Sequence, residues 1–183
     1  MGIPAIPLSD LYSAAGEYIR QRGGEVNLRA PVEKFKVDAH GVTLCMGGQE
    51  FRADFAVIAA PFNVISSLLP EDEASRPLRA MAAQFESSPI TGIHLWFDGQ
   101  ITDLEHAVLL DRTIQWMFHK SKLLNRGGDG SYVELVVSAS KSLVNRGRQE
   151  IIDLAVRELE EFFPTVRVAN LEKATVIKEV HAT

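Results

Sequence analysis

The apolar positions near the start of the chain repeat at helical spacing. Ser9 is suited to an N-cap, and apolar residues from Leu8 to Ile19 recur every three or four positions. Gly23 then interrupts the pattern, as glycine commonly does at a helix C-terminus because it adopts positive φ without strain. The pattern predicts an amphipathic helix over about residues 9–22.

The following segment alternates between apolar and polar residues, as strands with one exposed face do. It predicts a short strand over 25–29 and then a three-stranded antiparallel meander over 32–52. Residues 54–59 differ, because they are almost continuously apolar and precede Pro61. Such a run is typical of a strand buried on both faces of a parallel sheet, so we expect 54–59 to pair in parallel with 25–29.

After Pro61 the sequence predicts two short helices, over 62–69 and about 78–85, and then a region of strands. Gly, Asp and Asn cluster in the connections, including the predicted turn at 125–130. The strand candidates, which we expect to form an antiparallel sheet, are 90–97, 107–110, 114–119, 132–138 and 173–180.

A long amphipathic helix is predicted over residues 148–163. It should cross the sheet and end at Pro164, which cannot continue the helical hydrogen bonds. The expected apolar stripe consists of Ile152, Ala155, Val156, Leu159, Phe162 and Phe163. Three carboxylates, those of Glu158, Glu160 and Glu161, are expected outside this stripe and in solvent.

This order of elements predicts an α+β (mixed α/β) fold. Residues 1–61 should contain a helix, parallel strands and an antiparallel meander. Residues 62–183 should form an antiparallel sheet with packed helices.

Composition narrows the class of protein. The 183 residues are 46% hydrophobic and 23% charged, which is typical of a globular chain and excludes a disordered one. Nineteen basic against 24 acidic residues give a net charge of −5, so nucleic acid is not an expected partner. The single cysteine, Cys45, cannot form an internal disulfide, and no apolar run approaches the roughly 20 residues that span a bilayer. We therefore expect a cytoplasmic location.

The usual motifs for dinucleotides and metals are missing. A glycine-rich G-x-G-x-x-G turn between a strand and a helix is absent, and Gly128–Gly130 runs into a strand instead. The five histidines lack the short spacing of metal ligands, so no metal is expected. Cys45 is better explained as a small buried residue than as a nucleophile.

Large aromatic residues lie on neighbouring predicted strands and are candidates for a substrate pocket. They are His94 and Trp96 on one strand and Trp116 and Phe118 on another. This pattern suits an apolar pocket and a plain hydrophobic core equally well. His94 alternates away from the apolar side of its strand, so it either faces a cavity or is a hydrogen-bonded structural histidine.

Three segments in this order resemble the FAD-dependent amine oxidase and phytoene desaturase superfamily: Gly23–Val26, Ala30–Val32 and Arg52–Pro61. In that superfamily a helix and a G-G-x-V strand belong to the flavin domain. A meander follows, and an A-D-x-V-I-x-A-x-P strand returns to the sheet before the substrate domain.

Further segments resemble one branch, the squalene-associated FAD-dependent desaturases, which are bacterial hydroxysqualene dehydroxylases of hopanoid synthesis. They are Gly2–Tyr12, His94–Asp98, Gln115–Phe118 and Lys178–Thr183. Carotenoid desaturases and amine oxidases remain open as alternatives, as does a stand-alone α+β module that binds an apolar ligand or a partner protein without flavin.

The resemblance implies a fragment of a flavin-dependent oxidoreductase, with 1–61 as part of the FAD-binding domain and 62–183 as the substrate domain. The implied cofactor is FAD, with the backbone of Val32 at the adenine and Ala60 and Pro61 near the flavin. No catalytic side chain is implied. The implied substrate is an apolar isoprenoid, such as a squalene derivative, and the intact protein would contact membranes peripherally. Because the glycine-rich unit is absent, the isolated chain is not expected to retain FAD.

Overall fold

The computed structural model describes residues 2–125 and 128–182, and the chain divides into two compact units. One consists of Met1–Ala15 and Ser87–Thr183, and the other of Gly16–Glu86. The expected division of the chain at residue 61 stays a prediction. The assignment of cofactor and substrate roles to 1–61 and 62–183 stays a prediction.

The predicted N-terminal helix is present as α1, Leu8–Gln21, and the boundary between the units falls within it. Gly23 has a φ of 78°, and its N–H donates to the carbonyl of Arg20 at 3.0 Å. The N–H of Gly24 donates to the carbonyl of Ile19, also at 3.0 Å. These two bonds close the last turn of the helix, as glycine C-caps do.

The predicted meander forms the sheet of the Gly16–Glu86 unit. Its three antiparallel strands are β1, Lys34–Asp38, β2, Gly41–Met46, and β3, Gln49–Ala53. Two short helices follow as predicted, α2, Phe62–Leu68, and α3, Arg76–Ala82. The rings of Phe62 and Phe85 lie 5.6 Å apart at the ends of this helical pair.

The predicted parallel pair of strands is wrong: neither 25–29 nor 54–59 is a strand. Phe55 and Val57 are 88% and 94% exposed, so this apolar run is not buried. A strand that is buried on both faces needs neighbouring strands and covering layers. The described strands of this unit pair only with one another, in the antiparallel meander, and offer it no parallel partner.

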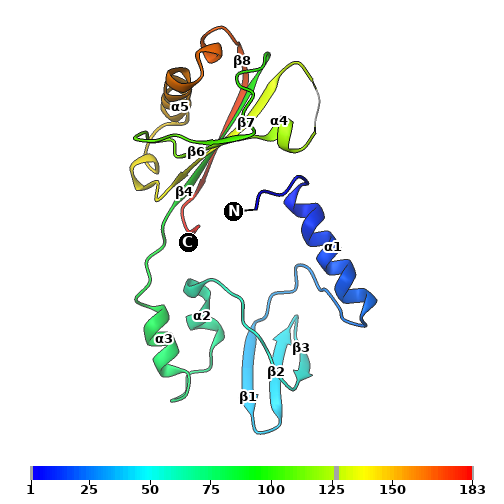
Figure 1. Ribbon diagram of the computed structural model, residues 1–183. Coiled ribbons are helices and arrows are strands. Elements are labelled where there is room, and N and C mark those ends of the chain that lie inside the picture. Colours follow the sequence, from blue (N-terminus) through cyan, green and yellow to red (C-terminus); the bar gives the residue numbers. More distant parts are fainter. Residues whose placement is uncertain (1, 126–127, 183) are drawn as a thin grey trace. The chain divides into compact units, whose positions relative to one another are not determined.

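The larger unit contains a five-stranded antiparallel sheet with strand order β5-β6-β7-β4-β8 (Figure 1). All five strand candidates of the sequence are present. Their bounds are Ile90–Phe97 for β4, His106–Val108 for β5, Trp116–His119 for β6, Ser131–Ser138 for β7 and Leu171–Glu179 for β8. Of the predicted turn at 125–130, residues 126 and 127 lie outside the described part of the chain.

Short helical turns connect these strands and were not indicated by the sequence pattern. They are α4, Lys120–Leu123, and two 3₁₀ turns, Lys141–Leu143 and Pro164–Arg167. The predicted long helix is α5, Arg148–Phe162. It packs on one face of the sheet and closes the hydrophobic core of the unit (Figure 1).

The core lies between α5 and the odd-numbered residues of β4. Ile93 and Leu95 are fully buried there, as are Ala155 and Leu159 on the helix. Phe162, which we expected within the apolar stripe, is 40% exposed at the helix end. Exposure alternates along β4, so one face of the strand is buried in the core and the other is half-buried.

Glu158 corrects the expectation of a solvated carboxylate. Its side chain is buried, and its two oxygens accept hydrogen bonds from the backbone N–H groups of Thr113, at 3.1 Å, and Ile114, at 2.8 Å. These N–H groups belong to the turn before β6, so the carboxylate ties α5 to that turn. Helical periodicity places Glu158 near the edge of the apolar stripe but carries no information about a distant backbone partner.

Replacing Leu159 by Ala should lower the free energy of unfolding by about 2 to 5 kcal/mol, because a fully buried leucine leaves a cavity in the core. Chemical denaturation of the purified chain measures this. Val168→Ala is the control, since Val168 is 83% exposed and exposed substitutions usually change stability by under about 0.5 kcal/mol. Equal effects for the two variants would contradict the placement of α5.

Candidate functional site

The face of the sheet opposite α5 carries the predicted pocket residues. His94 and Trp96 alternate with the core residues of β4, and Trp116 and Phe118 alternate with those of β6. All four are half-buried and lie on the same side of the sheet. We call this side the open face, because the hydrophobic core lies on the other side.

Aromatic rings on the open face form two stacks. Trp96 and Tyr132 are directly opposite each other on β4 and β7, with ring centroids 4.4 Å apart and planes at 6°. Trp116 and Phe118 stack at 5.9 Å and 7° on β6. Both tryptophans of the chain therefore lie on this surface. Flat aromatic surfaces of this kind suit contact with an apolar chain.

Polar groups lie between the two stacks. The Nδ1 atom of His94 is 2.9 Å from the Tyr132 hydroxyl oxygen. Glu134 is the cross-strand neighbour of both His94 and Phe118, and its carboxylate pairs with the Lys120 ammonium at 3.2 Å. The open face thus combines apolar area with a small number of placed polar atoms, which is the composition of small-molecule sites.

A groove of about 240 Å³ lies beside β6 and β7 on the open face, within the larger unit. The N-terminal segment forms one wall, and residues of β6, β7 and α4 form the other. Phe118 is the predicted pocket residue that lines it. The other lining residues are Gly2, Ile3, Pro4, Ile6, Leu8, Lys120, Leu123, Glu134 and Val136.

The sequence pattern did not single out Tyr132, Glu134 or Lys120. The first two could have been found, because alternation along β7 places them on the face opposite Val133 and Leu135. Their pairing with His94 and Trp96 depends on the β4–β7 register, which one sequence does not reveal. Lys120 reaches Glu134 only through the short helix α4, for which there was no sequence signal.

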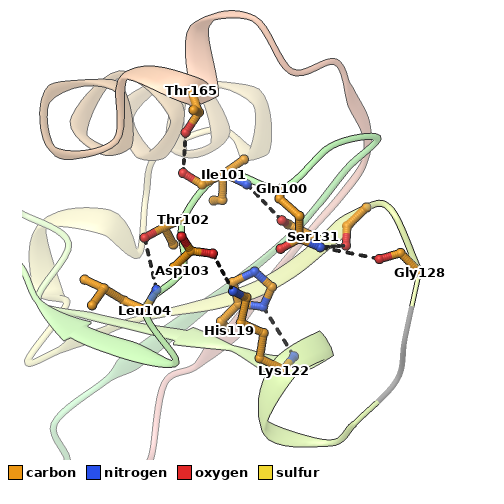
Figure 2. Close-up of polar contacts among 11 residues, drawn as sticks. Gln100, Ile101, Thr102, Asp103, Leu104, His119, Lys122, Gly128, Ser131 and Thr165 are labelled. Carbon is orange, nitrogen blue, oxygen red and sulfur yellow. Dashed lines mark hydrogen bonds and ion pairs between the residues drawn. The ribbon is translucent and has the colours of Figure 1, made fainter.

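His119 is a fully buried histidine at the end of β6, on the core side of the sheet. Its Nδ1 accepts a hydrogen bond from the backbone N–H of Lys122 at 3.4 Å and thereby caps α4 (Figure 2). The Lys122 ammonium pairs with Asp103, at 3.2 Å, in the loop after β4. Because α4 carries Lys120 and Leu123 at the groove, the imidazole supports one wall of it.

The neutral form of His119 is favoured in this position. Burial, and secondarily the charge of Lys122, lower the pKa of the imidazole below its ordinary value. With Nδ1 acting as acceptor, the proton of the neutral ring resides on Nε2. That nitrogen has no hydrogen-bond partner among the described residues.

Stability should therefore depend on pH through His119. Because its folded-state pKa is lowered, the unfolded chain binds the proton more readily, so the free energy of unfolding should fall as pH drops below about 6.5. Denaturation at pH 7.5, 6.5, 5.5 and 5.0 measures the slope. His119→Leu should flatten it. Leu135→Ala, a core variant that cannot titrate, should lower stability at every pH and leave the slope unchanged; an unchanged slope in His119→Leu would refute the assignment.

The predicted cofactor residues lie in the other unit. Val32 is half-buried and precedes the β1–β2 ladder, which begins at the pair Lys34 and Cys45, so its backbone lies outside those pairs. Ala60 is half-buried, and the carbonyl of Pro61 accepts bonds from Val64 and Ile65 at the start of α2. The three positions are close in sequence to the meander and α2, and their contact with a cofactor stays a prediction.

The predicted adenine contact at Val32 uses backbone groups alone and would not hold the phosphates of FAD. A pyrophosphate requires a glycine-rich turn between a strand and a helix. In the Gly16–Glu86 unit, the helices that follow loops, α2 and α3, begin after Pro61 and Ser75 instead. The N-termini of α2 and α3 therefore do not provide a site for the phosphates of the cofactor.

The described residues also bear on a metal site and on a membrane-spanning helix. Residues 2–125 and 128–182 contain no group of three or more His, Cys, Asp or Glu side chains that could hold a metal ion. Within the same residues, no helix has the length and apolar character needed to cross a bilayer.

Cys45 is half-buried on β2, with its Sγ 3.9 Å from a carboxylate oxygen of Glu33.

The sequence is similar to those of known desaturases. The 15-cis-phytoene desaturase of Capsicum annuum is 28% identical over 177 residues, which cover 88% of this chain and 29% of that protein. The 15-cis-phytoene desaturase of Synechococcus elongatus is 28% identical over 186 residues, covering 88% and 37%. The chain thus spans about a third of the length of these relatives.

A solved oxidoreductase from Methanosarcina mazei has the same fold, with a TM-score of 0.70 at 14% identity, covering 92% of this chain and 42% of that one. The model of the family described as flavin containing amine oxidoreductase matches residues 6–181. This match spans both units and agrees with the superfamily resemblance of the sequence. The chain belongs to the flavin containing amine oxidoreductase family.

Proposed function

We propose that this chain is part of a flavin-dependent desaturase or dehydroxylase whose substrate is an apolar isoprenoid, in particular a squalene derivative. The observation that carries the proposal is the open face of the sheet. Both tryptophans and their stacked partners are half-buried there, whereas the hydrophobic core lies on the other side of the sheet. The four aromatic rings are half-buried on this face and offer contact area to an apolar ligand. The relatives named as phytoene desaturases support the same class of substrate.

The chemistry assigned to this chain is binding and orientation. The flavin, when bound, supplies the hydride transfer, and in such enzymes the protein positions the substrate and excludes water. Trp96, Tyr132, Trp116 and Phe118 would contact the apolar chain of the substrate, and the adjoining groove would hold one of its ends. A substrate of this kind partitions into lipid, so we also propose peripheral membrane contact for the whole protein.

Cofactor binding is proposed to be shared. Val32, Ala60 and Pro61 would contribute the adenine edge and the surroundings of the flavin. A glycine-rich phosphate site would come from the two thirds of the relatives' length that this chain does not span. A lone backbone contact, worth about 0.5 to 1.5 kcal/mol, does not offset the several kcal/mol lost when a free ligand is immobilised.

The 183-residue chain should accordingly show no saturable FAD binding at micromolar concentrations. Quenching of flavin fluorescence and the visible spectrum of the purified chain measure this. A protein that contains this chain and spans the length of the desaturase relatives should instead purify with bound flavin. Stoichiometric flavin on the 183-residue chain would contradict the proposed division of the cofactor site.

In that longer protein, Trp96→Ala should lower kcat/KM for a squalene derivative about tenfold, because a large apolar contact surface is lost. Turnover is followed by mass spectrometry of the extracted product. Phe162→Ala, on the α5 side of the sheet, is the matched aromatic control and should change kcat/KM little. Absence of turnover with squalene derivatives and carotenoid precursors alike, in a flavin-loaded protein, would refute the substrate class.

A further inference from the structure

Strand β4, which lies between β7 and β8, has a glycine on the open face. Gly92 lies between Val136 of β7 and Ile177 of β8. It does not have the positive φ that would require glycine. A glycine inside a strand weakens it and often marks a place where a ligand approaches the backbone closely. The space above Gly92 therefore needs an explanation other than backbone geometry.

His94 presents one ring nitrogen to this space. A Cβ atom built on Gly92 would lie 3.7 Å from Nε2 of His94, an ordinary contact distance. The other ring nitrogen, Nδ1, is within 2.9 Å of the Tyr132 hydroxyl, and Tyr132 is stacked on Trp96. These contacts hold the imidazole in place, so Nε2 is the polar atom directed over the glycine.

The groove and the space above Gly92 are adjacent. Glu134 and Val136 line the groove, and they are the direct cross-strand partners of His94 and Gly92. Residues opposite each other on paired strands have side chains about 5 Å apart. An apolar chain in the groove would thus reach Nε2 of His94 without crossing another strand.

The charged side chains beside His94 already have partners in the chain. The carboxylate of Glu134 contacts Lys120 at 3.2 Å, and the ammonium of Lys173 lies 4.7 Å from the ring centre of Trp96. An anionic ligand group beside His94 would be repelled by Glu134. A cationic ligand group would have to compete with Lys120 for the carboxylate of Glu134. A neutral hydroxyl fits best, because it can donate or accept and so pairs with either tautomer of the imidazole.

We propose that Nε2 of His94, above Gly92, binds the hydroxyl group of a neutral terpenoid alcohol whose apolar chain lies on the aromatic stacks. His94 is then the residue that distinguishes an alcohol from the hydrocarbon of the same chain. The apolar part of this assignment rests on the proposed function, whereas the hydroxyl contact rests on His94 and Gly92.

Titration of the 183-residue chain with farnesol and with farnesene tests the proposal. Both tryptophans lie on the open face, so their fluorescence reports binding there directly. Farnesol should bind about three- to tenfold more tightly than farnesene, the gain expected from one hydrogen bond at a half-buried site. Thermal unfolding of each variant confirms that it is folded.

Two substitutions at His94 distinguish the contribution of Nε2 from that of Nδ1. In His94→Gln the amide reaches towards the Nε2 position, and the preference for farnesol should persist. In His94→Asn the amide reaches only the Nδ1 position beside Tyr132, and the preference should disappear.

Gly92→Ala fills the space above residue 92 without moving His94. It should lower the affinity for farnesol more than the affinity for farnesene. Thr175→Val, the neighbour of His94 on β8, is the control and should leave the preference unchanged.

The possible results distinguish the hydroxyl site from the apolar surface. Equal affinity for farnesol and farnesene in the wild type would overturn the hydroxyl site and leave the apolar surface intact. A preference that survives both His94→Asn and Gly92→Ala would also overturn it. Failure of both ligands to bind would overturn the hydroxyl site together with the proposed apolar substrate surface.

Discussion

The structure of the larger unit depends on the burial of one face of a five-stranded sheet under α5. Strand side chains alternate with a period of two, so fixing Ile93 and Leu95 in the core fixes His94 and Trp96 on the other side. A slip of one residue between β4 and β7 would exchange the two sets. The same hydrophobic contacts that stabilise the unit therefore set which residues are available to a ligand.

This coupling explains why much of the larger unit could be predicted from the sequence. The alternation along residues 90–97 and the apolar stripe that contains Leu159 are strong local signals, and both elements are present. The four aromatic candidates were identified by the same alternation. What they contact was not, because the stacking of Trp96 on Tyr132 depends on strand register and order. Glu158 illustrates the same limit, since its partners are backbone N–H groups more than forty residues away.

The Gly16–Glu86 unit shows where a local pattern is insufficient. The meander at 34–53 forms because consecutive antiparallel strands supply each other's hydrogen bonds. Residues 54–59 have an equally clear apolar pattern, yet Phe55 and Val57 are exposed. A buried parallel strand depends on partners that are distant in sequence, and the described strands here provide none. A family resemblance can indicate such partners, whereas the pattern of a single segment cannot.

The central claim is that one face of this sheet is core and the other binds an apolar ligand. Photolabelling with a diazirine-bearing farnesol, followed by mass spectrometric mapping of the modified residues, tests it most directly. We expect labels on β4, β6 and β7 at open-face positions such as Trp96, Trp116 and Tyr132, and we expect excess unlabelled farnesol to suppress them. Labels confined to the meander at 34–53, or spread over the chain without competition, would contradict it.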